Sequence, residues 1–182
     1  MVPHFIDPSV VASERRVFAS LRSASGSENW TVLHSLGISS DWTGEFGEID
    51  FVAIMPGTGI VCIEVKGGAV SVHNGVWTTL NRRGQAETLK RSPYRQAQEG
   101  MWKLLASIRA RFGPNSPEAR CPVGWLAVFP DVLCQPVTME ATRQEIIDRD
   151  DIDEDIGPRI RSAPSLLRLA SRSDLMKRRY SS

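Results

Sequence analysis

Residues 47–67, GEIDFVAIMPGTGIVCIEVKG, decide the fold, because they hold two strand-like runs joined by a Pro-Gly-Thr-Gly turn. Such a turn between apolar runs predicts an antiparallel hairpin. The first run carries Asp50 and the second carries Glu64 and Lys66, at positions that would otherwise be buried. The sequence therefore predicts a central hairpin with a polar site built into it.

Alternation along the two runs brings the charged residues together. Side chains two positions apart in a strand point the same way, so Glu64 and Lys66 share one face, as do Glu48 and Asp50. For the polar faces to coincide, Asp50 must lie opposite Glu64 or Lys66, unless a bulge shifts the register by one residue. Two carboxylates and an ammonium then converge, and two adjacent acids repel each other unless a cation joins them.

A hard divalent cation with oxygen ligands fits this set of side chains. Mg²⁺ or Mn²⁺ keeps several waters, lowers the pKa of an attacking water and stabilises charge on a phosphoryl oxygen. Lys66 would orient that water or offset charge in the transition state. The pattern thus indicates a metal-dependent phosphodiesterase site. The alternative is a surface ion pair of Glu64 with Lys66 or with an arginine.

A third carboxylate is predicted from residues 8–22, PSVVASERRVFASLR, where Pro8 and Ser9 are the start signals of a helix. Glu14 falls within the apolar stripe of that helix. A buried, unpaired carboxylate is costly, so it needs a cation or hydrogen-bond donors. An arginine partner is one explanation, but the arrangement with Asp50 and Glu64 favours a third metal-site carboxylate. The stripe consists of Val10, Val11, Val17, Phe18 and Leu21.

A second helix is predicted near 93–112, with Ser92 as N-cap and Pro93 as its first residue. Gln96 lies in the first turn, where backbone amides and the helix dipole favour a phosphate. A solvated glutamine beside the core is the alternative. The core stripe of this helix is Ala97, Met101, Leu104, Leu105 and Ile108.

The remaining segments complete a helix, three strands, a helix and a strand. Residues 30–36 alternate like a strand, and residues 123–130 form a buried strand after the second helix. Between them, 71–79 has Asn74-Gly75 at its centre, a strong two-residue hairpin signal, with Trp77 as a core residue. From about residue 139 the composition changes to an acidic helical segment. A Leu-rich basic tail then either packs on the core or begins a linker.

These motifs together resemble the nuclease-related domain, a branch of the PD-(D/E)xK nuclease superfamily, over roughly residues 8–138. The likeness implies an α/β fold with a restriction-endonuclease-like αβββαβ core, a mixed sheet flanked by helices and a short C-terminal helical appendage. It also implies a nuclease-related domain at 1–138 and an acidic segment with a basic helical extension at 139–182. The motifs are SERRVF (13–18), WTVLHSL (30–36), GEIDFVAI (47–54), GIVCIEVKGG (59–68), Trp77, SPYRQA (92–97) and VGWLAVFPD (123–131).

The resemblance also assigns roles to individual residues. It implies Asp50 and Glu64 as metal ligands and Lys66 as the catalytic lysine. It further implies Glu14 as the helix-borne acid and Gln96 as the glutamine of the second helix. The three acids would hold one or two Mg²⁺ or Mn²⁺ ions. Ile49 stands before Asp50 where the superfamily pattern has proline, a position at which many members vary.

The function expected from this resemblance is hydrolysis of phosphodiester bonds in DNA, in DNA processing, repair or defence. The alternative is a catalytically inactive module that binds nucleic acid or docks a partner. DNA is the expected ligand, and a helicase or another DNA-processing protein is an expected partner. A homodimer is a further possibility without a clear interface in the sequence.

Composition agrees with one enzyme-sized domain and a small appendage. The chain has 182 residues, 41% hydrophobic and 24% charged. Its three cysteines form no CxxC pair, so neither zinc sites nor disulfide frameworks are expected. The histidines His4, His34 and His73 lack metal-ligand spacing, and no GxSxG motif indicates a serine hydrolase. No apolar run of membrane length and no secretory leader is present, which favours the cytoplasm.

The net charge of +1 hides an asymmetry. Residues 140–155 hold eight acids and two arginines, a local balance of minus six, so the rest of the chain carries about plus seven. A basic core suits a phosphate-rich ligand, and arginine can grip phosphates bidentately. Trp42, in the loop 37–47, either contacts substrate or plugs the core. Candidate phosphate contacts, with ordinary solubility charges as the alternative, are Arg82, Arg83, Arg91 and Arg95.

Overall fold

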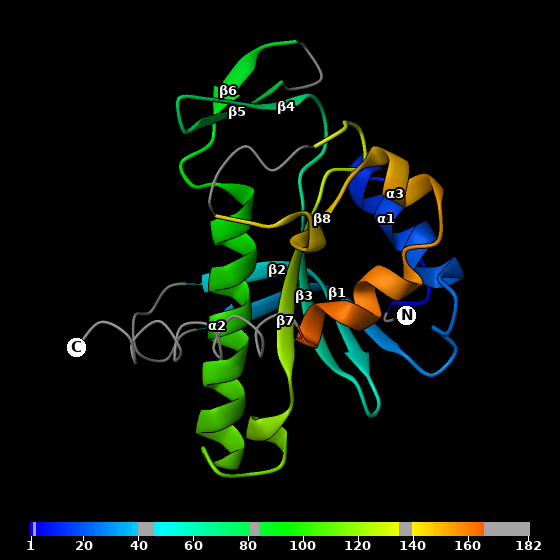
Figure 1. Ribbon diagram of the computed structural model, residues 1–182, viewed down its shortest axis with the longest axis vertical. Coiled ribbons are helices and arrows are strands. Elements are labelled where there is room, and N and C mark those ends of the chain that lie inside the picture. The colour runs from blue at the N-terminus through cyan, green and yellow to red at the C-terminus, as the bar shows by residue number, and fades with distance from the viewer. Residues whose placement is uncertain (2, 40–45, 81–83, 135–139, 166–182) are drawn as a thin grey trace, which may run out of the picture.

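The computed structural model is a mixed α/β domain built on a five-stranded mixed sheet with helices on both faces (Figure 1). It describes all residues except 2, 40–45, 81–83, 135–139 and 166–182. The main sheet has the order β1-β2-β3-β7-β8, and a second sheet has the order β4-β5-β6. The elements are α1 (Ala12–Ser23), β1 (Thr31–Ser39), β2 (Phe46–Met55), β3 (Gly59–Val65), β4 (Val70–His73), β5 (Val76–Leu80), β6 (Ala86–Thr88), α2 (Pro93–Phe112), η1 (Glu118–Arg120), β7 (Val123–Val128), η2 (Arg143–Glu145), β8 (Ile146–Ile147) and α3 (Arg149–Asp153).

The predicted central hairpin is formed by β2 and β3. The two strands pair antiparallel from Met55 opposite Gly59 to Phe51 opposite Ile63. One further step in this register places Asp50 opposite Glu64, one of the two predicted arrangements. Strand β3 then pairs in parallel with β7, so the hairpin lies inside the sheet and not at its edge.

The core has two halves because β3 and β7 are covered on both faces. In Figure 1, α2 lies on one side of the sheet, and α1, α3 and the helical residues 157–165 lie on the other. The α1 side buries Val17, Phe18 and Leu21. The α2 side buries Ala97, Met101 and Leu105, together with Cys62 and Trp125 of the sheet. Both predicted stripes therefore face the sheet, although Leu104 and Ile108 are only partly buried.

The first helix begins later than the sequence predicts. Its first residue is Ala12, while Asp7 accepts a hydrogen bond from the Ser9 N–H at 2.7 Å and its carbonyl accepts one from the Val10 N–H at 3.0 Å. These bonds give the segment a local turn in place of the first helical turn. Val10 and Val11 thus precede the helix, and Val11 is 47% exposed. Glu14 consequently lies in the first turn of α1 and not in the middle of a longer stripe.

The second helix and the hairpin beside it form as predicted. Ser92 caps α2 by accepting the Arg95 N–H at 3.2 Å, and the helix ends where Gly113 adopts a φ of 90°. Asn74 and Gly75, with φ of 50° and 77°, connect β4 to β5. The third strand of this small sheet, β6, is only three residues long and was not predicted.

Trp77 is a core residue, as expected. Its ring stacks on Phe129 at 6.2 Å between centroids and meets the edge of Tyr94 at 5.1 Å. These contacts attach the small sheet to the α2 side of the core. The small sheet otherwise projects beyond the N-terminal end of α2 (Figure 1).

The acidic segment is not simply helical. It contains η2, the two-residue strand β8 and the short helix α3, and β8 extends the main sheet by pairing in parallel with β7. Its apolar residues enter the core, whereas Asp151 pairs with Arg143 and Arg159 at 2.8 and 3.2 Å. The expected boundary at residue 138 falls outside the described residues. The buried side chains of this segment include Ile146, Ile147, Ile152, Ile156 and Ile160.

Among the residues that the structure describes, no helix combines the length and apolar character needed to cross a membrane.

Because the segment after residue 140 completes the core on the α1 side, a cavity there should destabilise the whole domain. Ile160 is fully buried, so Ile160→Ala should lower the free energy of unfolding by about 2–4 kcal/mol. Ile54→Ala, at a position 37% exposed, is the control and should cost less than about 1.5 kcal/mol. Urea unfolding measures both. Equal small losses would mean that the segment is not part of the cooperative core.

Candidate active site in an acidic cavity

The site begins with a distortion of β1 and β2 at Asp50. The two strands pair on both sides of this point, but Ser35, which stands where a partner of Asp50 would be, has a φ of 57°. Ile49 packs on the α2 side although alternation from Phe51 would place it on the other. A left-handed residue in a strand bends the ladder locally. The bend lies where Asp50 borders the cavity described next.

A cavity of about 700 Å³ lies at this bend. Side chains from α1, β2, β3 and α2 line it, so it draws on both helices and on the sheet. Four of the predicted site residues are among them, namely Glu14, Asp50, Glu64 and Gln96. The structure thus brings together residues that lie up to 82 positions apart in the chain. Glu48, Glu99, Arg91 and Lys103 also line the cavity.

Asp50 and Glu64 form the buried centre of the acidic group. Burial and the neighbouring Glu64 charge raise the pKa of Asp50 to about 7, against the opposing effect of the Val65 N–H. That N–H donates to Asp50 Oδ2 at 2.7 Å. Burial also raises the pKa of Glu64, with Lys66 opposing the shift. Two carboxylates therefore share a poorly solvated place in which a positive charge is favoured.

Lys66 contacts Glu64 directly. Its Nζ lies 2.7 Å from Glu64 Oε1, and its backbone N–H donates to the Val128 carbonyl at 2.9 Å. The ion pair considered as an alternative does form, but it lies inside the site and not on the surface, because the Glu64 side chain is only 9% exposed. Lys66 itself does not line the cavity. Its ammonium reaches the site through Glu64.

Glu14 reaches the site because the start of α1 packs against the end of β3. A side chain at Gly67 would clash with Ser13, so a glycine permits this approach. The partner of Glu14 is His34, not an arginine, with Nε2 and Oε2 2.9 Å apart. The His34 ring is 9% exposed and lies against Phe51 at 4.8 Å between centroids.

His34 was not predicted as a site residue. Histidine spacing gave no signal, because its partner comes from another element. The alternation of residues in WTVLHSL could have indicated it, because His34 lies two positions after the buried Val32 and so points to the same side of the strand.

Residues of α2 and the segment just before it form one wall of the cavity. Gln96 Nε2 donates to the Arg91 carbonyl at 3.1 Å, and the Arg91 side chain pairs with Glu99. Arg95 does not line the cavity; it is exposed and its Nε lies 3.4 Å from Glu140 Oε1. Of the two predicted nucleic-acid contacts that the structure describes, Arg91 therefore borders the site and Arg95 does not. Arg82, Arg83 and Trp42 lie outside the described residues.

The carboxylates fit a hard divalent cation in their chemistry. Glu14, Asp50 and Glu64 offer oxygen donors of the kind that Mg²⁺ and Mn²⁺ prefer, and burial together with the neighbouring Glu64 charge raises the pKa of Asp50. Within the described part of the chain, however, no three acid, imidazole or thiol side chains are placed closely enough to hold a metal ion. The donor set fits, and the side chains would have to adjust to form a complete ligand cluster.

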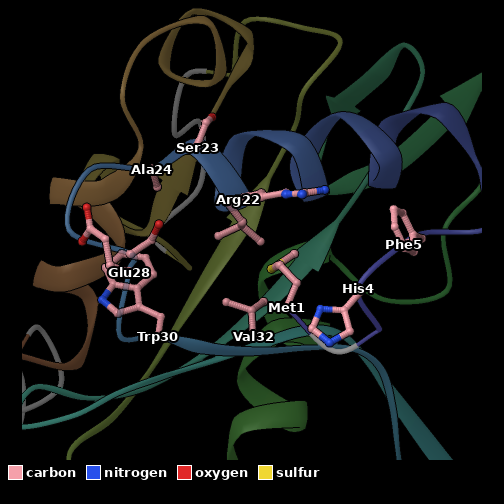
Figure 2. A pocket seen from close by; sticks show the side chains of 11 residues that line it. Met1, His4, Phe5, Arg22, Ser23, Ala24, Glu28, Trp30 and Val32 are labelled. Carbon is pink, nitrogen blue, oxygen red and sulfur yellow. The ribbon is translucent and has the colours of Figure 1, made fainter.

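Two other features are less suited to phosphodiester chemistry. Burial raises the pKa of the Cys62 thiol to about 12, which leaves it protonated and inert as a nucleophile. A second cavity of about 530 Å³ lies between the end of α1 and the start of β1 (Figure 2). Its lining includes Leu21, Trp30 and Val32, and Glu28 is the only carboxylate among the described residues around it.

The protein is thus a mixed α/β domain with a cavity lined by carboxylates and a glutamine, and Lys66 is paired with one of these carboxylates, Glu64. The family model of the nuclease-related domain matches residues 10–130. The chain therefore belongs to the nuclease-related domain family, as the sequence resemblance indicated. Comparison with curated proteins found no match, and neither did comparison with solved structures.

The raised pKa of Asp50 should make stability depend on pH. The unfolded chain releases this proton near pH 4 and the folded chain only near pH 7, so the free energy of unfolding falls across that range, because the unfolded chain is ionised while folded Asp50 still holds its proton. Asp50→Asn still accepts the Val65 N–H but carries no charge. Its stability relative to the parent should rise by on the order of 1–2 kcal/mol between about pH 4 and about pH 8.

Urea unfolding without divalent ions across this pH range tests the prediction. Glu118→Gln makes the same acid-to-amide change at an exposed position and controls for the loss of one charge. A constant difference between Asp50→Asn and the parent at every pH would contradict a raised pKa at Asp50.

Proposed function

We propose that this chain is a Mg²⁺- or Mn²⁺-dependent nuclease of the PD-(D/E)xK type that hydrolyses phosphodiester bonds in DNA. The observation that carries the proposal is the buried pair of Asp50 and Glu64 beside Lys66, on a cavity that Glu14 and Gln96 also line. Membership of the nuclease-related domain family supports an action on nucleic acids. The order of α1, β1, β2, β3, α2 and β7 supports the αβββαβ core expected of that superfamily.

Glu14, Asp50 and Glu64 are the residues that would hold the cation. When bound, the ion would lower the pKa of an attacking water and stabilise charge on the phosphoryl oxygens. The three carboxylates come from a helix and two strands that the core holds rigidly. His34 donates to Glu14 and is itself held by Phe51, so it fixes one carboxylate in place.

Lys66 and Gln96 act on the substrate side. The Lys66 ammonium, 2.7 Å from Glu64, is positioned to orient the water or to offset charge in the transition state. Gln96 sits in the first turn of α2, where the positive end of the helix dipole favours a phosphate. Its amide orients Lys66 or the scissile phosphate.

Two observations favour a second candidate function. The Glu64–Lys66 pair and the lack of a three-ligand cluster among the described residues are also compatible with a non-catalytic domain that binds nucleic acid or docks a partner. Metal binding separates the two functions. The roles in DNA processing, repair or defence, the helicase partner, the cytoplasmic location and a homodimer stay predictions from the sequence.

Removal of the lysine charge should abolish cleavage. Lys66→Met keeps the stem but loses the ammonium, and we expect about a hundredfold or greater loss of Mn²⁺-dependent cleavage of labelled DNA. Asp50→Asn should lose activity to a similar extent. Lys90→Met, at an exposed position outside the cavity, is the matched control. Single-strand, duplex, flap and junction DNAs should be tested, with thermal unfolding to verify the fold. Unchanged cleavage by Lys66→Met would refute the mechanism.

Metal affinity should depend on His34 without His34 being a ligand. Calorimetric titration with Mn²⁺ should detect binding to the parent and about tenfold weaker binding to His34→Ala, because Glu14 loses its donor. His34→Gln, which can still donate, should restore most of the affinity. Absence of Mn²⁺ and Mg²⁺ binding to the parent protein would favour the non-catalytic function. Equal Mn²⁺ affinity in all variants would show that His34 does not contribute to metal binding.

A further inference from the structure

We propose that Lys103 binds a backbone phosphate about three nucleotides from the scissile phosphate, and so sets the length of DNA that the site grips. This inference rests on the proposed nuclease function and extends it to the path of the substrate. It assigns a role to a residue of α2 that lines the acidic cavity two turns beyond Gln96.

Two glycines place Lys103 over the cavity. A Cβ at Gly100 would lie 3.0 Å from Cγ1 of Ile49, so the missing side chain allows α2 to approach β2 closely. A Cβ at Gly47 would lie 3.2 Å from Nζ and 3.5 Å from Cδ of Lys103. The lysine stem therefore crosses from α2 to β2 through space that a larger residue at 47 would occupy. The half-buried side chain is guided to this wall of the cavity.

The charge of Lys103 is available to a ligand. Two cations among the described residues line the cavity, Lys103 and Arg91, and Arg91 pairs with Glu99. Lys103 forms no ion pair with any residue in the described part of the chain. An ammonium on the wall of a site for phosphodiesters, with no partner of its own, is suited to a phosphate oxygen.

The spacing of the two α2 residues predicts the distance along the substrate. Gln96 and Lys103 are seven residues apart, which places them on one face of the helix and about 10 Å apart along its axis. One DNA strand advances about 3.4 Å per phosphate along the duplex axis. If Gln96 lies at the scissile phosphate, Lys103 reaches a phosphate about three nucleotides away.

A structural role is the competing explanation. Lys103 is four residues after Glu99 on α2, a spacing at which opposite charges support a helix. Such a role would change stability but would leave the salt dependence of DNA binding unaltered. It would also affect long and short substrates alike. These two readouts therefore separate phosphate binding from helix support.

Steady-state cleavage with Mn²⁺ tests the inference on two substrates of different length. For a labelled DNA duplex of about 20 base pairs, longer than the predicted contact region, Lys103→Met should raise KM about tenfold with little change in kcat. Hydrolysis of bis(p-nitrophenyl) phosphate should not change, because this small diester occupies only the reaction centre. Lys103→Arg should restore KM. Gly47→Ala, which displaces the ammonium but keeps its charge, should raise KM less.

DNA binding without turnover gives the second readout. With Mn²⁺ in the inactive Lys66→Met background, the slope of log K against log salt for the same duplex should become shallower by about 0.9 when Lys103→Met is added, the loss of one phosphate contact on duplex DNA. Lys90→Met is the matched control, since Lys90 is exposed and does not line the cavity. Its slope should differ from that of the parent by less than that of Lys103→Met.

These experiments distinguish failure of the Lys103 inference from failure of the proposed function. An unchanged slope in Lys103→Met, or equal effects on the oligonucleotide and the small diester, overturns the inference but leaves the proposed function standing. A parent protein that neither cleaves nor binds the DNA overturns both.

Discussion

The structure depends on placing two carboxylates, Asp50 and Glu64, opposite each other at the buried end of the β2–β3 hairpin. Burial raises the pKa of both groups, and the Glu64 charge raises that of Asp50 further, so the arrangement is unfavourable when both carboxylates are ionised. A domain tolerates such a pair when the packing around it is stable enough to hold it in place. Here helices cover both faces of the hairpin. The remaining features of the site either offset this charge or make use of it.

Close packing of α1 and α2 against the sheet brings the other site residues to Asp50 and Glu64. Gly67 lets the start of α1 pack on the end of β3, which carries Glu14 to the cavity, and Gly100 lets α2 lie close to β2. The bend at Ser35 occurs beside Asp50, where the sheet meets both helices. The cavity is therefore a product of packing at three contacts, and no single element contains it.

The charged side chains around the cavity give it a negative electrostatic potential. In the described part of the chain, five carboxylates and two cations line it, so without a ligand it favours positive charge at its centre. A phosphate-rich substrate would be repelled by this wall unless a cation neutralised it. Among the described residues, the basic side chains that border the cavity are Lys103 on α2 and Arg91 just before its N-cap, on the side where a strand of DNA would pass under the proposed function.

The sequence by itself determined the elements whose signals are local. The turn at 56–59, the Ser92 cap with Pro93 and the Asn74-Gly75 turn each specify backbone geometry within a few residues, so the hairpins and α2 were predictable. The acids Asp50 and Glu64 stood out because charge interrupts a buried pattern. The start of α1 was mispredicted because an Asp7 turn outcompeted the first helical turn.

Only the tertiary structure decided which distant residues share the cavity. The pairing of His34 with Glu14 and the position of Lys103 above Gly47 arise from helix–sheet packing and leave no spacing in the chain. Strand β8 is only two residues long, so it has no recognisable alternation in the sequence, and it is defined by its parallel pairing with β7. Local periodicity encodes which face a residue takes, whereas the partner it meets depends on how those faces pack.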